Sequence, residues 1–102
     1  MNFETGNLYI CPGFFHFIFP DIDSADQATY AGDFYENDAI IATQSWTRFF
    51  GKRIDYCDSS KPILFLAVEK ETNHGKIYLV LTDFKKGWII VEDWQKWKNV
   101  VD

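Results

Sequence analysis

The first 47 residues contain no lysine or arginine, because all ten basic residues lie at Arg48 or later. Seven of the fifteen acidic residues precede Arg48, so residues 1–47 carry about −7 and the remainder about +2, within a formal net charge of −5. The basic residues are interleaved with acids, and no basic run suited to phosphate contacts is present. The sequence therefore predicts no direct binding of nucleic acid.

Long apolar runs are also missing, and no basic segment of the kind that opens a signal peptide follows Met1. We therefore expect a cytoplasmic protein without membrane contact. Cysteine is scarce, with only Cys11 and Cys57. In a reducing compartment we expect both to be free core thiols that resist thiol reagents until the chain unfolds.

Sequence motifs of catalysis are absent: there is no phosphate-binding glycine loop, HExxH, CxxC or GxSxG. No local motif pairs a cysteine with His16 or His74 as nucleophile and base. The acids Asp21, Asp23 and Asp26 lack the glycine and distal glutamate of a calcium-binding loop. The sequence predicts a protein that is not an enzyme, with no catalytic residue, metal site or cofactor.

What the chain does contain is apolar and aromatic. Its 102 residues are 47% hydrophobic and 19% aromatic, with three prolines and six glycines. This composition is typical of a folded domain and far from that of a disordered chain. We expect a single domain over residues 1–102, long enough to form a core without disulfide bonds or metals.

The second half shows four strand-like segments separated by turn residues. These segments are Lys52–Cys57, Ile63–Lys70, Lys76–Thr82 and Trp88–Val91. Their short connections predict a strongly curved antiparallel meander of consecutive neighbours. Within it we expect Leu66, Leu79 and Ile89 to be mostly buried.

Two of these strands are apolar on both faces, since neither Ile63–Val68 nor Ile77–Leu81 alternates with polar residues. A strand that is apolar on both sides needs cover on both sides. Either the rest of the chain or a second molecule provides that cover.

The first half predicts additional strands and a long acidic loop. Asn7–Cys11 and Phe14–Phe19 indicate two strands, or one bent strand, interrupted by Pro12 and Gly13. Pro20–Asp38 holds six carboxylates and no cation, and it predicts a loop with at most one helical turn, capped by Ser24 or Asp23.

Two short helices are expected beyond this loop. The apolar residues of Ala39–Phe50 fit neither the helical period nor the strand period well. Ser45 as an N-cap and Gly51 as a stop nevertheless favour a short helix between them. Near the C-terminus, Asp93 is a candidate N-cap for a helix over Trp94–Val101. That helix would place Trp94 and Trp97 on one stripe, against the sheet or toward a partner.

Short strands, a long loop after the first of them, and a Gly87-Trp88 pair that opens a strand after a lysine-rich hairpin resemble an SH3-like barrel. The resemblance covers Ile63–Trp97. It implies a small β-barrel and, for the usual members of that fold, binding of proline-rich peptides. The expected fold is therefore mainly β, either a small SH3-like barrel or a strongly curved antiparallel meander, with a long acidic loop and a short C-terminal helix.

Aromatic residues interleaved with the acids suggest a binding surface. We predict a non-enzymatic protein-binding module whose aromatic groove and acidic loop bind a basic or peptide partner. Its expected partner-binding residues are Asp21, Asp23, Asp26, Tyr30, Asp33, Phe34, Tyr35 and Trp88. The alternatives are a structural protein that forms a homo-oligomer through its apolar sheet face, and a small acidic inhibitor that mimics nucleic acid.

Overall fold

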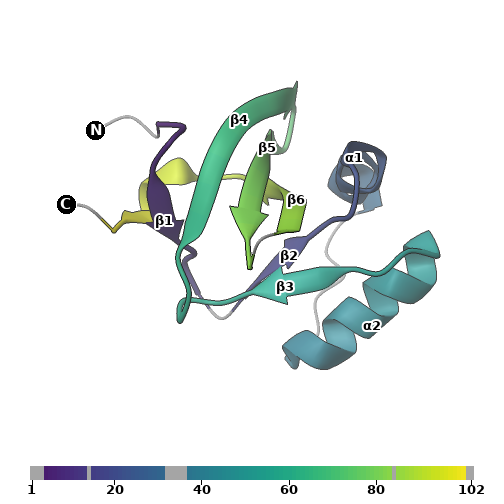
Figure 1. Cartoon of the computed structure of the whole chain (residues 1–102). Coiled ribbons are helices and arrows are strands. Elements are labelled where there is room, and N and C mark those ends of the chain that lie inside the picture. The colour runs from purple at the N-terminus through teal and green to yellow at the C-terminus, as the bar shows by residue number, and fades with distance from the viewer. Residues whose placement is uncertain (1–3, 14, 32–36, 84, 101–102) are drawn as a thin grey trace.

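The computed structural model describes residues 4–13, 15–31, 37–83 and 85–100. Five strands in this part of the chain form an antiparallel sheet in the order β6-β5-β4-β1-β7, and β2 and β3 form a second, two-stranded sheet (Figure 1). The strands are β1 (Leu8–Ile10), β2 (His16–Ile18), β3 (Asp55–Cys57), β4 (Ile63–Thr72), β5 (Gly75–Thr82), β6 (Lys85–Val91) and β7 (Lys98–Asn99). Two helices, α1 (Ile22–Ala31) and α2 (Ala39–Phe50), lie on one side of the molecule (Figure 1).

The antiparallel meander is confirmed for β4, β5 and β6. Thr72 pairs with Gly75 and Thr82 pairs with Lys85, so both hairpins close with only two residues between the paired positions. The ladder between β4 and β5 contains two register shifts, and such irregularities bend a strand. The long, curved course of β4 is visible in Figure 1.

The predicted place of the Lys52–Cys57 strand is wrong. β3 pairs with β2 rather than with β4, with His16 opposite Cys57 and Ile18 opposite Asp55. The strand is also shorter than predicted, beginning at Asp55. Because this pairing joins segments about forty residues apart, the local turn chemistry from which the meander was inferred carries no information about it. The described strands do not close into a barrel.

The two sheets are joined where the chain leaves β2. The backbone N–H of Phe19 donates to Trp88 O at 2.9 Å, and Trp88 N–H donates to Phe19 O at 3.0 Å. A Cβ atom at Gly87 would collide with Cγ2 of Ile18, so the close approach of β2 to β6 needs a glycine there. The Gly87-Trp88 pair noted in the sequence thus has a packing function.

α2 is a full helix, longer than expected. Oδ1 of Asp38 accepts hydrogen bonds from the N–H groups of Ile40 and Ile41, which starts the helix well before Ser45. The predicted stop is confirmed, since Gly51 has φ +69° and donates its N–H to Thr47 O.

α1 corrects the prediction of a long acidic loop. Asp21 caps the helix by accepting a hydrogen bond from Ser24 N–H at 2.8 Å. The inner face of α1 is formed by small residues, with Ser24, Ala25 and Thr29 buried. Small side chains let the helix approach β4, β5 and β6 closely, although they leave no apolar period to detect in the sequence.

The predicted C-terminal helix is also wrong. Asp93 does act as a cap, accepting from Gln95 N–H at 3.1 Å, but only one 3-10 turn (Trp94–Lys96) follows. The chain becomes extended at Trp97 and then pairs as β7 with β1. Trp97 is 6% exposed and belongs to the core, whereas Trp94 is 38% exposed.

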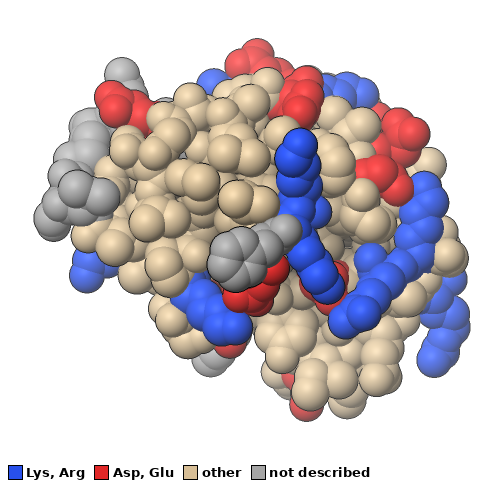
Figure 2. Space-filling model, viewed as in Figure 1, with Lys and Arg blue, Asp and Glu red and all other residues tan. Residues whose placement is uncertain are grey.

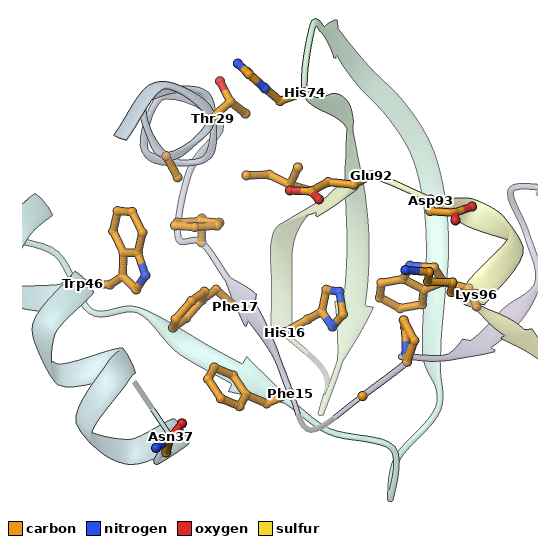
Figure 3. Close-up of a pocket in the computed structure, with 16 residues that line it drawn as sticks. Phe15, His16, Phe17, Thr29, Asn37, Trp46, His74, Glu92, Asp93 and Lys96 are labelled. Atoms are coloured by element: carbon orange, nitrogen blue, oxygen red, sulfur yellow. The ribbon is translucent and has the colours of Figure 1, made fainter. Parts of the chain in front are cut away.

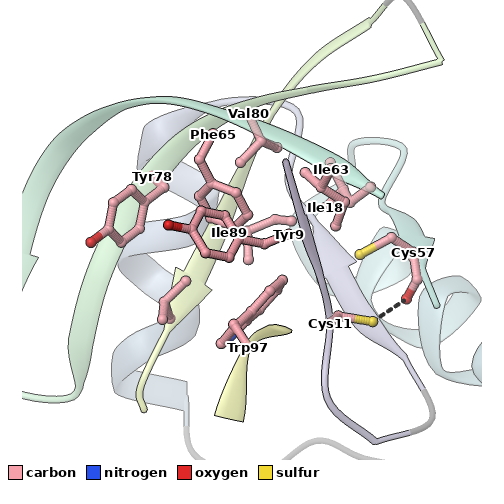
Figure 4. Close-up of a cluster of buried hydrophobic side chains, with 11 residues drawn as sticks. Tyr9, Cys11, Ile18, Cys57, Ile63, Phe65, Tyr78, Val80, Ile89 and Trp97 are labelled. Carbon is pink, nitrogen blue, oxygen red and sulfur yellow. Dashed lines mark hydrogen bonds between the residues drawn. The ribbon is translucent and has the colours of Figure 1, made fainter. Parts of the chain in front are cut away.

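Each face of the large sheet carries its own core, so the chain itself covers a part of both apolar faces. The first cluster is drawn in Figure 4 and consists of Tyr9, Cys11, Ile18, Cys57, Ile63, Phe65, Tyr78, Val80, Ile89, Val91 and Trp97. The second lies toward the helices and consists of Phe17, Phe19, Ala25, Ala42, Trp46, Ile54 and Ile77. Of the predicted core residues, Ile89 is fully buried, while Leu66 and Leu79 are partly exposed.

Candidate functional site

A cavity of about 1070 Å³ opens between β2, the two helices and the segment after β6. Figure 3 shows that its two sides differ in character. Phe15, Phe17 and Trp46 form an aromatic side, and Glu92 and Lys96 lie on a polar side opposite. The volume lies slightly above the usual range for ligand pockets, about 300–1,000 Å³.

The aromatic side follows from the period of a β-strand. Phe15, Phe17 and Phe19 alternate along the β2 segment and therefore point to one side of it. The rings of Phe15 and Phe17 are 5.3 Å apart, edge to face, and Phe17 contacts Trp46 of α2 at 5.7 Å. Trp46 is stacked on Phe50 with an interplanar angle of 9°, which fixes the indole in place.

The polar side comes from the residues that follow β6. Glu92 and Asp93 are both exposed, and Lys96 belongs to the 3-10 turn. Since the Asp93 carboxylate already caps that turn, Glu92 is the carboxylate that is freer to meet a ligand. No cation of the described residues forms an ion pair with Glu92.

His16 lies between the two sides of the cavity (Figure 3). Its ring contacts that of Trp97 at 4.8 Å. Within the described part of the chain its buried Nδ1 atom has no hydrogen-bond partner. A buried polar atom without a partner is costly, so a ligand that hydrogen-bonds this nitrogen would be stabilised at the site.

The structure pairs two of the predicted partner-binding acids with lysines of the second half. Asp21 contacts Lys52 Nζ at 2.7 Å, and Asp26 contacts Lys70 Nζ at 2.8 Å. The hydrogen bond from Lys52 holds the pKa of Asp21 below its ordinary value. The separation of charge along the sequence is therefore partly cancelled in space, and acidic and basic side chains lie beside each other in Figure 2.

The other predicted residues do not gather at the cavity. Asp23 and Tyr30 are exposed on α1, with Tyr30 at 74%. Trp88 is half-buried against the second core cluster and does not line the cavity. The last three predicted residues, Asp33, Phe34 and Tyr35, lie outside the described residues.

The sequence contained a signal for part of the cavity that the prediction did not use. The alternation of Phe15, Phe17 and Phe19 marks an aromatic strand face. The positions of Trp46 and His16 relative to that face depend on long-range packing, for which no local pattern exists.

Replacing Asp21 by alanine should lower the free energy of unfolding by about 1 kcal/mol at pH 7, because the helix loses its N-cap and the ion pair to Lys52. Asp23→Asn is the control and should change stability by less than about 0.5 kcal/mol. Because the folded-state pKa of Asp21 is depressed, its contribution is present at neutral pH and is lost as the pH falls through that pKa. Urea unfolding at pH 7 and pH 3 measures both effects; equal stability of both variants at pH 7 would contradict the assignment.

The chain matches no protein-family model, no curated protein and no solved structure among those compared. Within residues 4–13, 15–31, 37–83 and 85–100, no group of three or more histidine, cysteine or acidic side chains is placed to hold a metal ion. Neither described helix has the length and apolar character required to cross a bilayer.

Proposed function

We propose that this protein is a non-enzymatic binding module, and that its cavity receives a basic side chain from a partner peptide. The observation that carries this proposal is the pairing of an aromatic side, Phe15, Phe17 and Trp46, with an exposed carboxylate, Glu92, across one cavity. The alkyl part of an arginine packs on aromatic rings and its guanidinium is attracted to their faces. The carboxylate opposite then pairs with the charge.

The size and charge of the molecule fit the same partner. A cavity of about 1070 Å³ exceeds the needs of one side chain, so it has room for a short segment of peptide. The net charge of −5 favours the approach of a basic chain and makes the association rate depend on salt.

The carboxylates at the start of α1 and within it contribute in a different way from that predicted. Asp21 and Asp26 are engaged by lysines, so their role is to hold the helix that supplies one end of the cavity through Ala28 and Thr29. Asp23 remains available for long-range attraction only.

A homo-oligomer and a nucleic-acid mimic are weaker candidates. The apolar faces that suggested an oligomer lie partly against the chain's own two core clusters, while Leu66 and Leu79 stay partly exposed. The acids that suggested a mimic are partly neutralised by Lys52 and Lys70. Sedimentation equilibrium at micromolar concentration distinguishes the homo-oligomer from a monomeric binding module, because the oligomer requires a mass that is a multiple of 12.0 kDa.

Titration with a short peptide of alternating arginine and glycine tests the proposal. We expect saturable binding that weakens with added salt, and no binding of the matching glutamate peptide. Glu92→Gln should weaken binding about threefold to fivefold, the range of an exposed ion pair of up to about 1 kcal/mol.

Asp23→Asn is the matched control, since it removes the same charge from an exposed position away from the cavity. Equal weakening by both substitutions would assign the effect to overall charge and reject the cavity. Binding of neither peptide to the wild-type protein would reject a basic partner.

A further inference from the structure

Three residues with nucleophilic or titratable side chains meet beside the first core cluster. Cys11 follows β1, Cys57 ends β3 and His16 begins β2. The Cys11 thiol donates to the carbonyl oxygen of Cys57 at 3.8 Å, and the Cys57 thiol donates to the carbonyl oxygen of His16 at 3.6 Å. Figure 4 shows the two sulfur atoms next to each other at the edge of the cluster.

The fold, not the sequence spacing, brings these residues together. Cys11 and Cys57 are 46 positions apart, and the antiparallel pairing of β2 with β3 sets His16 directly opposite Cys57. Both cysteines are free, with exposures of only 2% and 7%. Their burial confirms the predicted core position of each thiol.

The two thiols differ in acidity. The adjacent Cys57 side chain, followed by His16, lowers the pKa of Cys11 from 9.0 to about 5. The neighbouring Cys11 sulfur and burial raise the pKa of Cys57. At neutral pH the pair therefore consists of one nucleophilic sulfur and one protonated sulfur.

We propose that Cys11 and Cys57 are a redox-active pair that a hydroperoxide converts into an intramolecular disulfide bond. Burial excludes bulky thiol reagents from both sulfurs. Neither sulfur lines the cavity, but His16 and Pro12, the residue next to Cys11, do, so a small hydroperoxide in the cavity lies close to the pair. This inference does not rest on the proposed peptide binding, although both use the same cavity.

The chemistry balances in two steps. The Cys11 thiolate attacks one oxygen of the hydroperoxide, an S–O bond forms, the O–O bond breaks, and the leaving oxygen takes a proton to become water or an alcohol. The Cys57 sulfur then attacks the sulfenic sulfur of Cys11. An S–S bond forms and the S–O bond breaks, and the departing hydroxide takes the Cys57 proton to form a second water. Two thiols are oxidised and one peroxide is reduced.

His16 is a positioning residue in this pair, because its side chain helps to hold Cys11 as the thiolate. His16→Ala should slow the first step at pH 6, where the change in thiolate fraction is largest, and should slow it less at pH 9. A merely structural role of the imidazole would slow oxidation by the same factor at both pH values.

The test treats the folded full-length chain with hydrogen peroxide and counts the remaining thiols after denaturation. We expect intact mass to fall by two hydrogen atoms, proteolysis to yield a peptide joining Cys11 to Cys57, and dithiothreitol to reverse both changes. Cys57→Ser should stop at a sulfenic acid on Cys11, which dimedone traps when the oxidised chain is unfolded in its presence, and Cys11→Ser should give no sulfenic acid at the same peroxide dose.

The wild-type mass measurement decides the proposal even where a serine variant fails to fold. Two intact thiols, at a peroxide dose that fully oxidises glutathione, would overturn it. So would a disulfide between two chains, or dimedone labelling of Cys57 instead of Cys11.

Discussion

Replacing Phe65 by alanine should destabilise the protein by about 3 to 5 kcal/mol. Phe65 is fully buried at the centre of the first core cluster. Its ring makes edge-to-face contacts with Tyr9, Tyr78 and Trp97 at 5.3 to 5.5 Å. Alanine would leave a cavity that these three neighbours, held by different strands and the C-terminal segment, cannot close together.

Chemical denaturation measures this effect, with Val68→Ala as the control in the same strand. Val68 is 44% exposed, so Val68→Ala should lower the free energy of unfolding by less than about 1 kcal/mol. A domain of this size has a total stability of roughly 5 to 15 kcal/mol, so Phe65→Ala should remove a large fraction of that stability. A loss no greater for Phe65→Ala than for Val68→Ala would contradict the position of the first core.

Trp46→Ala should cost a similar amount, about 3 to 5 kcal/mol, through the second core cluster. Trp46 is 3% exposed and contacts Phe17 in β2, Phe19 just after β2 and Phe50 of its own helix. Removing the indole would detach α2 from the second sheet as well as opening a cavity. Peptide binding should be lost in the same variant, because the indole forms part of the aromatic side of the cavity.

Phe49→Ala is the matched control for this substitution, since Phe49 lies in the same helix but is 57% exposed. It should cost less than about 1 kcal/mol and should leave peptide binding nearly unchanged. Thermal unfolding and peptide titration of both variants give the two readouts. Preserved binding in a folded Trp46→Ala variant would place the binding site elsewhere.

The part of the fold that local chemistry specifies could be predicted. β4, β5 and β6 follow from apolar runs closed by short turns, and Asp93 and Gly51 were identified as helix-terminal residues from residue type alone. The pairing of β3 with β2 could not be predicted, because it is a long-range contact with no periodic signal. The predicted C-terminal helix does not form because burial of Trp97 in the first core stabilises the chain more than another turn of helix would.

Helix α1 was missed for a different reason. Its buried face is formed by serine, alanine and threonine, so the usual apolar stripe is absent. The acids on it therefore suggested a solvated loop, and the expectation of a free acidic surface followed. Two of those acids are paired with Lys52 and Lys70, which lie far along the sequence but near in space.

The most direct test of the proposed function is a nuclear magnetic resonance titration that follows the four tryptophan indole N–H signals. Trp46 and Trp97 line the cavity, whereas Trp94 and Trp88 do not. With the arginine–glycine peptide, we predict that the Trp46 and Trp97 signals shift with one common Kd, while the Trp94 signal stays in place. Peptide binding that leaves the Trp46 and Trp97 signals unchanged would contradict the assignment of the cavity as the binding site.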